Sequence, residues 1–281
     1  MSEHIELSDY DREPLPDLIR LRAPNAGMMT GTGTNTWILA DGAIVVDPGP
    51  ADPAHVDAIL ESCIVEPQAV FVTHTHKDHS PGAAMLAARC KANLIGQGAP
   101  LGFPDRQDES FAPDHVPKHD EQISVAGQHI IAIHTPGHAS NHYCYLHEAT
   151  GTLFSGDHIN QGATVVIPPP DGSMQAYLNS MQLLRDYPIN FIAPGHGALI
   201  DDPDQIITRL IRHRLLRESK VMRVLAAIGP ATIDELLPLV YDDVKKELLP
   251  VAAYSLEAHL LKLEEDEAAL CESRQWLPIA R

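Results

Sequence analysis

The stretch that decides the fold is VTHTHKDHSPG at residues 72–82. It places His74, His76, Asp78 and His79 at the end of the apolar run at residues 69–73, which reads as a buried strand. Two histidines at positions i and i+2 of a tight turn can reach one metal ion, while the carboxylate and the histidine that follow face a neighbouring ion. One short loop therefore carries ligands for two metals.

Three further motifs carry a side chain of the same kind after an apolar run. They are TPGH at 135–138, SGDH at 155–158 and PGHG at 194–197, which contribute His138, Asp157 and His196. Each run reads as a strand, so these side chains are expected to project from strand ends toward one edge of a sheet and to form a dinuclear site. Carboxylate oxygens favour divalent Zn, Mn or Fe, and no cysteine lies in these motifs.

The motif order HxHxDH, TPGH, SGDH and PGHG resembles the metallo-β-lactamase superfamily of hydrolases over roughly residues 20–200. The resemblance implies an α/β fold, an αββα sandwich with its site at one edge of two facing sheets. It implies two divalent ions, with Zn expected first and Mn or Fe as alternatives. Carried over residue by residue, it assigns one metal to His74, His76 and His138, and the second to Asp78, His79 and His196, with Asp157 bridging.

The expected reaction is hydrolysis. No Ser or Cys stands beside a base as a nucleophile, so we expect a hydroxide shared by the two metals and oriented by Asp157 to attack. The candidate catalytic residues are Asp78, Asp157, His142 and His158, of which the two histidines are candidates for proton donor or substrate partner. True β-lactamases of the superfamily generally lack an aspartate at the position of Asp157. The SGDH motif thus points to the glyoxalase II, thioesterase and nuclease branches.

The last 80 or so residues differ in character from the rest. Apolar residues recur at helical spacing from Ile206 to Leu216, interleaved with arginines, and Thr232 and Glu235 form a capping-box pattern. A third helix is expected over 250–264 and a short ribbon over 271–279. Three helices and a ribbon resemble a winged helix, which accompanies one branch of this superfamily. We therefore expect a hydrolase domain at residues 1–203 and a winged-helix-like domain at 204–281.

The sequence separates the substrate classes only weakly. An ester or thioester hydrolase needs an apolar groove, which residues 165–170 after SGDH could line, although they could equally be a buried strand and a turn. A single-stranded RNA endoribonuclease needs a basic path and aromatic platforms, but aromatic residues make up only 5% of the chain. The third alternative is a non-hydrolytic metal-binding protein with a regulatory or interaction role. A small ester or thioester is the favoured substrate, with RNA as the alternative.

Composition sets broader limits. The net charge of −18 disfavours nonspecific attraction to nucleic acid or anionic lipid. Four cysteines without CxxC pairing favour a reducing compartment, and no apolar run resembles a signal peptide or a bilayer span. We expect a cytoplasmic protein without a membrane partner, and the winged helix is expected to pack on the hydrolase domain or to form a homodimer.

Two other segments bear on the site. Asp47 closes a strand, and the resemblance implies that its carboxylate steadies the ligand loop. Residues 96–118 are rich in Pro, Gly, Asp and Gln and follow the ligand loop, so they are either a substrate lid or a surface excursion.

Overall fold

The structure is a computed structural model that describes residues 11–12, 15, 18–103, 105–162 and 164–279. The chain forms two compact units. Unit 1 comprises Met1–Thr135, Asn141–Ala163 and Pro188–Pro203, and unit 2 comprises Pro136–Ser140, Thr164–Tyr187 and Asp204–Arg281. The domain boundary expected between residues 203 and 204 stays a prediction.

The first sheet of unit 1 has, among the described residues, six strands that lie side by side in chain order. They are β1 (Asp11–Arg12), β2 (Ile19–Arg22), β3 (Asn35–Leu39), β4 (Ile44–Val46), β5 (Ala69–Phe71) and β6 (Asn93–Ile95). Strands β1 to β4 are antiparallel, whereas β4, β5 and β6 are parallel. Strands β3 and β4 form an antiparallel hairpin. Its turn, η2 (Ala40–Gly42), needs glycine at position 42, because φ is 105° and a Cβ atom there would lie 2.4 Å from the Cβ atom of Cys63.

The second sheet of unit 1 has the order β11-β10-β9-β8-β7 among the described residues. Its strands are β7 (Glu121–Val125), β8 (Gln128–His134), β9 (Tyr143–His147), β10 (Thr152–Gly156) and β11 (Phe191–Pro194). Only β10 and β11 are parallel, and Gly156 pairs with Pro194 at their carboxyl ends. The residues that follow these two strands, Asp157 and His196, therefore emerge at the same edge of the sheet.

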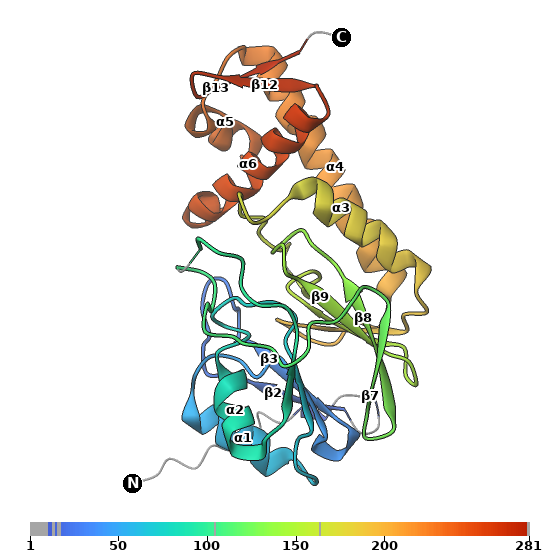
Figure 1. The fold of residues 1–281 in the computed structure, drawn as a ribbon. Coiled ribbons are helices and arrows are strands. Elements are labelled where there is room, and N and C mark those ends of the chain that lie inside the picture. The colour runs from blue at the N-terminus through green and yellow to red at the C-terminus, as the bar shows by residue number, and fades with distance from the viewer. Residues whose placement is uncertain (1–10, 13–14, 16–17, 104, 163, 280–281) are drawn as a thin grey trace. The chain divides into compact units, whose positions relative to one another are not determined.

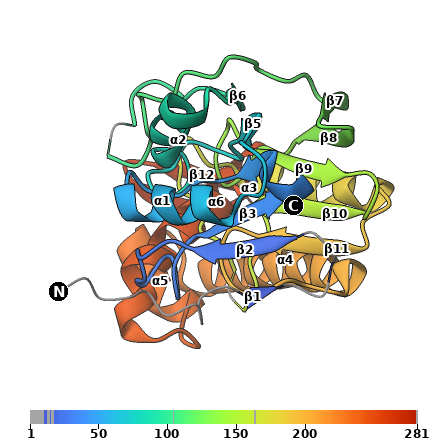
Figure 2. The same ribbon diagram turned by 90° about the horizontal axis from the view of Figure 1, so that it is seen from below.

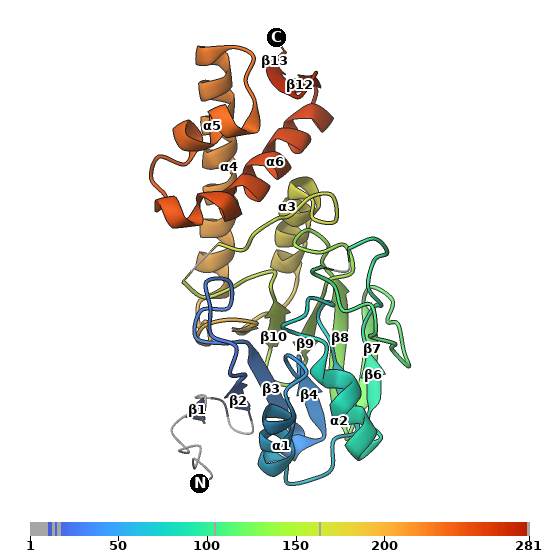
Figure 3. The same cartoon turned by 90° about the vertical axis from the view of Figure 1, so that its left-hand side faces the viewer.

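The core of unit 1 lies between the two sheets. Large buried side chains from the first sheet, including Trp37 and Phe71, pack with Tyr145 and Phe154 from the second. A second cluster lies on the other face of the first sheet, where α1 (Pro53–Ser62) and α2 (Gly82–Cys90) cover it (Figures 2 and 3). The side chains on β4 and β5 are buried on both faces, which explains why these strands are continuously apolar.

Unit 2 is mostly helical and ends in a two-stranded ribbon (Figure 1). Its elements are α3 (Met174–Leu183), η3 (Leu184–Asp186), α4 (Pro203–Ile228), α5 (Ile233–Val240), η4 (Lys246–Leu248), α6 (Leu249–Glu265), β12 (Ala269–Glu272) and β13 (Gln275–Pro278). The predicted capping box is confirmed, since Thr232 Oγ1 accepts from Glu235 N and Thr232 N donates to Glu235 Oε2. Side chains of α4, α5, α6 and the ribbon share one apolar cluster, the core of the winged helix.

Two arginines of α4, Arg214 and Arg217, are buried and engaged inside unit 2, whereas Arg209, Arg212 and Arg223 are exposed. Arg214 is buried and donates to the carbonyl oxygen of Val165. Arg217 makes a two-pronged contact with the Asp243 carboxylate, at 2.8 and 3.0 Å. Both cations bind groups within unit 2.

Stability of unit 2 is expected to fall as the pH falls from about 6.5 to about 4. His259 is fully buried and faces Glu218, Arg214 and Arg217. Burial, opposed only in part by Glu218, lowers its pKa from 6.5 to about 4. The unfolded chain therefore binds one more proton than the folded chain between these pH values, so acid favours unfolding. The free energy of unfolding, measured with urea at a series of pH values, gives the slope of stability against pH.

The variant His259→Gln is expected to reduce the slope of the unfolding free energy against pH. By the linkage relation, the reduction corresponds to at most one proton per chain taken up on unfolding. The slope does not vanish, because His55 in unit 1 also has a pKa lowered to about 4, mainly by burial. The matched control is His129→Gln, which changes an exposed histidine and leaves the slope as it is. Equal slopes for all three proteins would refute the assignment to His259.

Candidate metal centre

The loop after β5 is held in one conformation by its own backbone. The amides of His79 and Ser80 both donate to the carbonyl oxygen of His76, at 2.9 and 3.2 Å. A Cβ atom at Gly82 would lie only 2.5 Å from the carbonyl oxygen of Pro48, so no larger residue fits where α2 begins. The loop is thus a tight turn that packs against the Pro48-Gly49 segment.

Asp47 supports this loop, in agreement with its expected role. One carboxylate oxygen accepts from the Thr73 amide at 2.8 Å, and the other accepts from the Thr73 hydroxyl at 2.7 Å. The second oxygen also lies 2.9 Å from His79 Nδ1. A proton on Nδ1 satisfies this contact and leaves Nε2 of His79 as the atom that can bind a metal.

One candidate ligand group consists of Asp78, His79, Asp157 and His196. Nε2 of His196 lies 3.3 Å from Asp78 Oδ2 and 3.2 Å from Asp157 Oδ1. Nε2 of His79 lies 3.4 and 3.5 Å from the same two oxygens. Two ligands of one tetrahedral ion, with bonds of about 2.0–2.1 Å, are about 3.3 Å apart. The four atoms therefore have the spacing of a single coordination sphere.

The hydrogen bonding of this group also fits a metal ion. Nε2 of His79 and Nε2 of His196 are buried, and neither makes a hydrogen bond. A buried polar atom without a partner is costly, and a metal ion at the centre of the four atoms would satisfy both nitrogens and both carboxylates. The residues present thus fit a divalent cation.

The charges of this ligand group also fit a bound cation. Burial opposes ionisation of Asp157, but His196 and His79 outweigh it and hold the pKa of this carboxyl well below its usual range. Burial likewise opposes protonation of His196, and Asp157 outweighs it to raise the pKa of this imidazole to about 10. A buried carboxylate, that of Asp157, beside the partly buried one of Asp78 requires cations nearby, which protons on the imidazoles or a divalent ion can supply.

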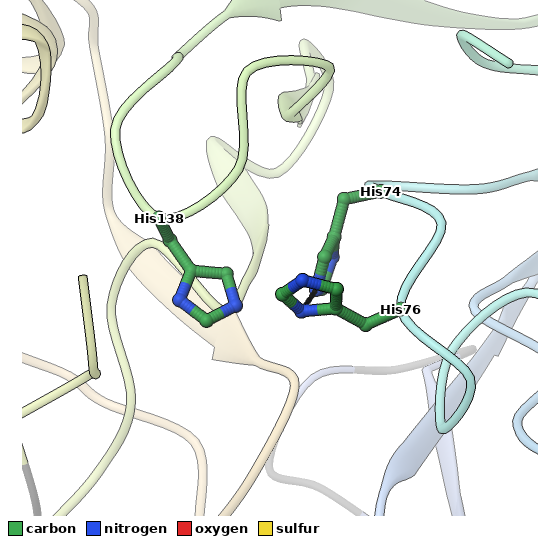
Figure 4. Close-up of side chains that lie close together, drawn as sticks. All are labelled: His74, His76 and His138. Carbon is green, nitrogen blue, oxygen red and sulfur yellow. Dashed lines mark hydrogen bonds between the residues drawn. The ribbon is translucent and has the colours of Figure 1, made fainter. Parts of the chain in front are cut away.

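The other candidate group consists of His74, His76 and His138, each of which offers a ring nitrogen within 4.8 Å of the others (Figure 4). Nε2 of His74 lies 3.0 Å from Nδ1 of His76. Nδ1 of His138 lies 2.6 Å from the carbonyl oxygen of Val166, which fixes the ring and leaves its Nε2 as the atom that can bind a metal. Three imidazole nitrogens are a typical ligand set for Zn and also suit Fe.

Comparison with known proteins now identifies the fold. The family model described as "Metallo-beta-lactamase superfamily" matches residues 29–196, and the model described as "Beta-lactamase associated winged helix domain" matches residues 232–276. The chain belongs to the metallo-β-lactamase superfamily. This confirms the predicted family, the α/β fold class and the C-terminal winged helix.

Two relatives and a solved structure support the assignment to this superfamily. The chain is 30% identical to the lactamase-like protein aptB of Emericella nidulans, over 92% of this chain and 86% of that relative. It is 28% identical to an atrochrysone carboxyl ACP thioesterase of Aspergillus chevalieri, over 96% and 90%. The fold matches a β-lactamase domain protein from Burkholderia ambifaria with a TM-score of 0.81 at 18% identity, over 98% and 94%. The protein is a hydrolase of this superfamily and not a true β-lactamase.

Two asparagines that were not among the predicted site residues hold the superfamily motifs in place. The Asn160 amide donates to Asp157 Oδ1 at 3.0 Å, and its oxygen accepts from the His196 amide at 2.9 Å. Asn35 donates to the carbonyl oxygens of Pro194 and Gly197, at 3.0 and 2.8 Å. Asn160 lies three residues after Asp157, which is the one local signal that could have drawn attention to it.

The TPGH turn, which carries His138, packs within unit 2 against the start of α3. Gly137 has φ of 151°, and a Cβ atom there would lie 2.4 Å from Cα of Tyr177, so only glycine fits. The Ser180 hydroxyl donates to the carbonyl oxygen of Pro136 at 2.8 Å. These contacts hold His138 at a set distance from α3.

Residues 164–167 do not form a β-strand, although a buried strand was one of the two predictions for this segment. The carbonyl oxygen of Val165 accepts from Arg214, and that of Val166 faces the His138 ring. Because side chains use these carbonyl groups, no neighbouring strand is needed to satisfy them. The segment is thus an irregular support for His138.

His142 and His158 are both fully buried. The His142 ring lies beside His74, with ring centroids 5.1 Å apart, and its Nδ1 lies 2.9 Å from Thr135 Oγ1. The His158 ring lies 5.6 Å from that of His142. Burial favours a positioning role for both, and a catalytic contact of either with substrate stays a prediction.

The 96–118 segment is anchored to the ligand loop at its middle. The Asp108 amide donates to the Thr75 carbonyl oxygen at 2.6 Å, and the Ser80 hydroxyl donates to the Asp108 carboxylate at 2.8 Å. Gln107 is also buried, and its side-chain oxygen accepts from the Thr75 hydroxyl at 2.6 Å. Around residues 107–108 the segment therefore braces the metal loop, and a lid movement there would break these bonds.

The expected partners of the protein concern membranes, RNA and a second copy of the chain. Within the described residues, no helix combines the length and apolarity that crossing a bilayer requires. The two partners kept open by the sequence, RNA and a second copy of the chain, gain no support.

Proposed function

We propose that this protein is a dinuclear metal-dependent hydrolase that acts on acyl thioesters. The observation that carries the proposal is the pair of adjoining ligand groups, one of three histidines and one of two histidines and two aspartates. The choice of thioester rests on relatives, because two of them are named as thioesterases, the atrochrysone carboxyl ACP thioesterase and the thioesterase pkgB of Emericella nidulans.

In this proposal, His74, His76 and His138 would hold one ion. Asp78, His79 and His196 would hold the second, and Asp157 is the carboxylate that the superfamily resemblance assigns to both. When bound, two divalent ions lower the pKa of water to about 7, which supplies a hydroxide nucleophile at neutral pH, and polarise the thioester carbonyl. Zn is the first expectation for the metal, with Mn or Fe as alternatives.

The side chains of the protein orient this chemistry. Asp157 is held by the Asn160 amide at 3.0 Å, so its carboxylate keeps one direction and can accept a hydrogen bond from the attacking water. His79 is held by Asp47 through Nδ1. We assign to His142 the support of His74, because their rings lie against each other away from solvent. Rigid supports of this kind reduce the reorganisation needed at the moment of reaction.

An ester is the closest alternative to a thioester, since the same carbonyl is attacked in both. Single-stranded RNA is the weaker alternative, because aromatic residues make up only 5% of the chain and three of the cations of α4, Arg214, Arg217 and Lys220, are engaged by protein groups. No observation favours a non-hydrolytic role.

The test is a parallel screen of the chelator-treated protein and of the same protein reloaded with Zn, Mn or Fe. The substrates are acetyl and octanoyl thioesters of N-acetylcysteamine, matched oxygen esters, a lactone and single-stranded RNA, and metal content is measured by mass spectrometry. We expect two ions per chain, thioester turnover that disappears with the metal, and no RNA cleavage. RNA cleavage without thioester turnover, or full activity in the metal-free protein, would overturn the proposal.

A further inference from the structure

Unit 2 contains a pocket of about 210 Å³ between α6 and the segment that leads into α3. Its apolar lining includes Pro169, Pro170 and Met174 on one side and Ala258 and Leu261 on the other. We propose that this pocket binds the acyl chain of the substrate, so that the winged helix, through α6, selects chain length. The inference rests on the proposed thioester hydrolysis and adds to it the part of the substrate that is recognised.

The pocket adjoins the turn that carries His138. Ser173, which lines the pocket, donates its amide to the carbonyl oxygen of Gly137 at 2.8 Å. A Cβ atom at Gly172 would lie 3.1 Å from the same oxygen. The pocket wall is thus in direct contact with the residue before a candidate metal ligand, and both belong to unit 2. A chain bound in the pocket therefore extends from the neighbourhood of His138.

The charges around the pocket select a neutral ligand. The ammonium group of Lys262 is bonded to Glu218 at 3.2 Å and to Asp266 at 2.6 Å, so its methylene stem remains as lining. Glu264 and Glu265, at the rim, are exposed and anionic, which disfavours phosphate groups. An uncharged hydrocarbon chain meets none of these costs.

The volume sets the length of chain that fits. An apolar cavity of about 150 Å³ holds a benzene molecule, so a pocket of this size holds about eight carbon atoms. Each buried methylene group strengthens binding by roughly two- to fourfold. We therefore expect kcat/KM for acyl thioesters of N-acetylcysteamine to rise with chain length up to about C8 and then to level off.

The variant Leu261→Trp tests the assignment of the pocket. Leu261 is 36% exposed, so a larger side chain can be accommodated without unfolding, and it narrows the pocket. We expect the ratio of kcat/KM for C8 to that for C2 to fall at least tenfold, while C2 turnover stays within twofold of the unchanged protein. Leu261→Ala is expected to move the preferred length above C8. The matched control is Leu239→Trp, a 45% exposed leucine on α5 that does not line the pocket.

Equal losses for C2 and C8 in Leu261→Trp, or the same loss of ratio in Leu239→Trp, would overturn the pocket assignment. A readout that does not need turnover separates this failure from a failure of the proposed function. The NMR signal of the Met174 methyl group, labelled with ¹³C and assigned with Met174→Leu, is expected to shift when N-acetyl-N′-octanoylethylenediamine is added, a non-hydrolysable analogue in which NH replaces the thioester sulfur. The signal of the exposed Met28 is expected to stay unchanged. A Met174 shift without any thioesterase activity supports the pocket and refutes the reaction. Chain-length dependence without a Met174 shift refutes the pocket alone.

Discussion

Replacing Asp157 with asparagine is expected to lower kcat for thioester hydrolysis by about 1000-fold or more, because metal and carboxylate chemistry supplies several kcal/mol of transition-state stabilisation. Asp157 Oδ1 lies 3.2 Å from His196 Nε2 and 3.5 Å from His79 Nε2, so the change removes a negative charge from the centre of one ligand group. Metal content is expected to fall toward one ion per chain. Steady-state kinetics and mass spectrometry of the same preparations check both results.

The control for this change is Asp186→Asn, the same substitution at an exposed aspartate outside both ligand groups. It is expected to leave kcat and metal content as they are. An Asp157→Asn protein that binds two ions and retains more than about a tenth of the activity would contradict the bridging role, because a group held against both ions is worth far more than this.

Replacing Asp47 with alanine is expected to lower the free energy of unfolding by about 3 kcal/mol, since a buried amide and hydroxyl lose a charged partner. Asp47 is 2% exposed and accepts from the amide and the hydroxyl of Thr73. His79 also loses the carboxylate that fixes its ring, so metal affinity is expected to weaken by about 10- to 100-fold. Urea unfolding and competition with a chelator measure the two effects.

The control is Asp52→Ala, which removes an aspartate of the same unit that caps α1 by accepting from the amides of Ala54 and His55. It is expected to cost about 1 kcal/mol of stability and to leave metal affinity unchanged. The role assigned to Asp47 fails if the two variants bind metal equally well.

The grouping of the candidate ligands could be predicted because each lies within a few residues of a strand end. In the parallel pair β10 and β11, for example, Asp157 and His196 follow the paired residues Gly156 and Pro194, so the pairing of the strands brings them together, across a register shift between Phe154 and Gly156. The role of Asn160 was not predictable, because an asparagine in a loop has many uses and only its contacts with Asp157 and His196 reveal this one. The same holds for Asn35, which bonds to Pro194 from 159 positions away.

The arginines of α4 show a different limit of prediction from the sequence. Helical spacing predicted the helix, but it could not tell whether an arginine faces solvent or protein. Arg214 and Arg217 bind Val165 and Asp243, residues 49 and 26 positions away. Likewise, residues 164–167 have the composition of a strand, yet their carbonyl groups are satisfied by side chains from other elements.

The sequence by itself determined the family, the ligand residue types and the strands that carry them, because strand patterns and turn motifs are local and survive without knowledge of distant partners. Only the tertiary structure decided which atoms meet. It gave the 3.2–3.5 Å spacing of the second ligand group, the burial of His142 and His158, the anchoring of the 96–118 segment and the pocket beside α6. These features depend on distances between residues far apart in the chain, and such distances are set by packing rather than by local sequence.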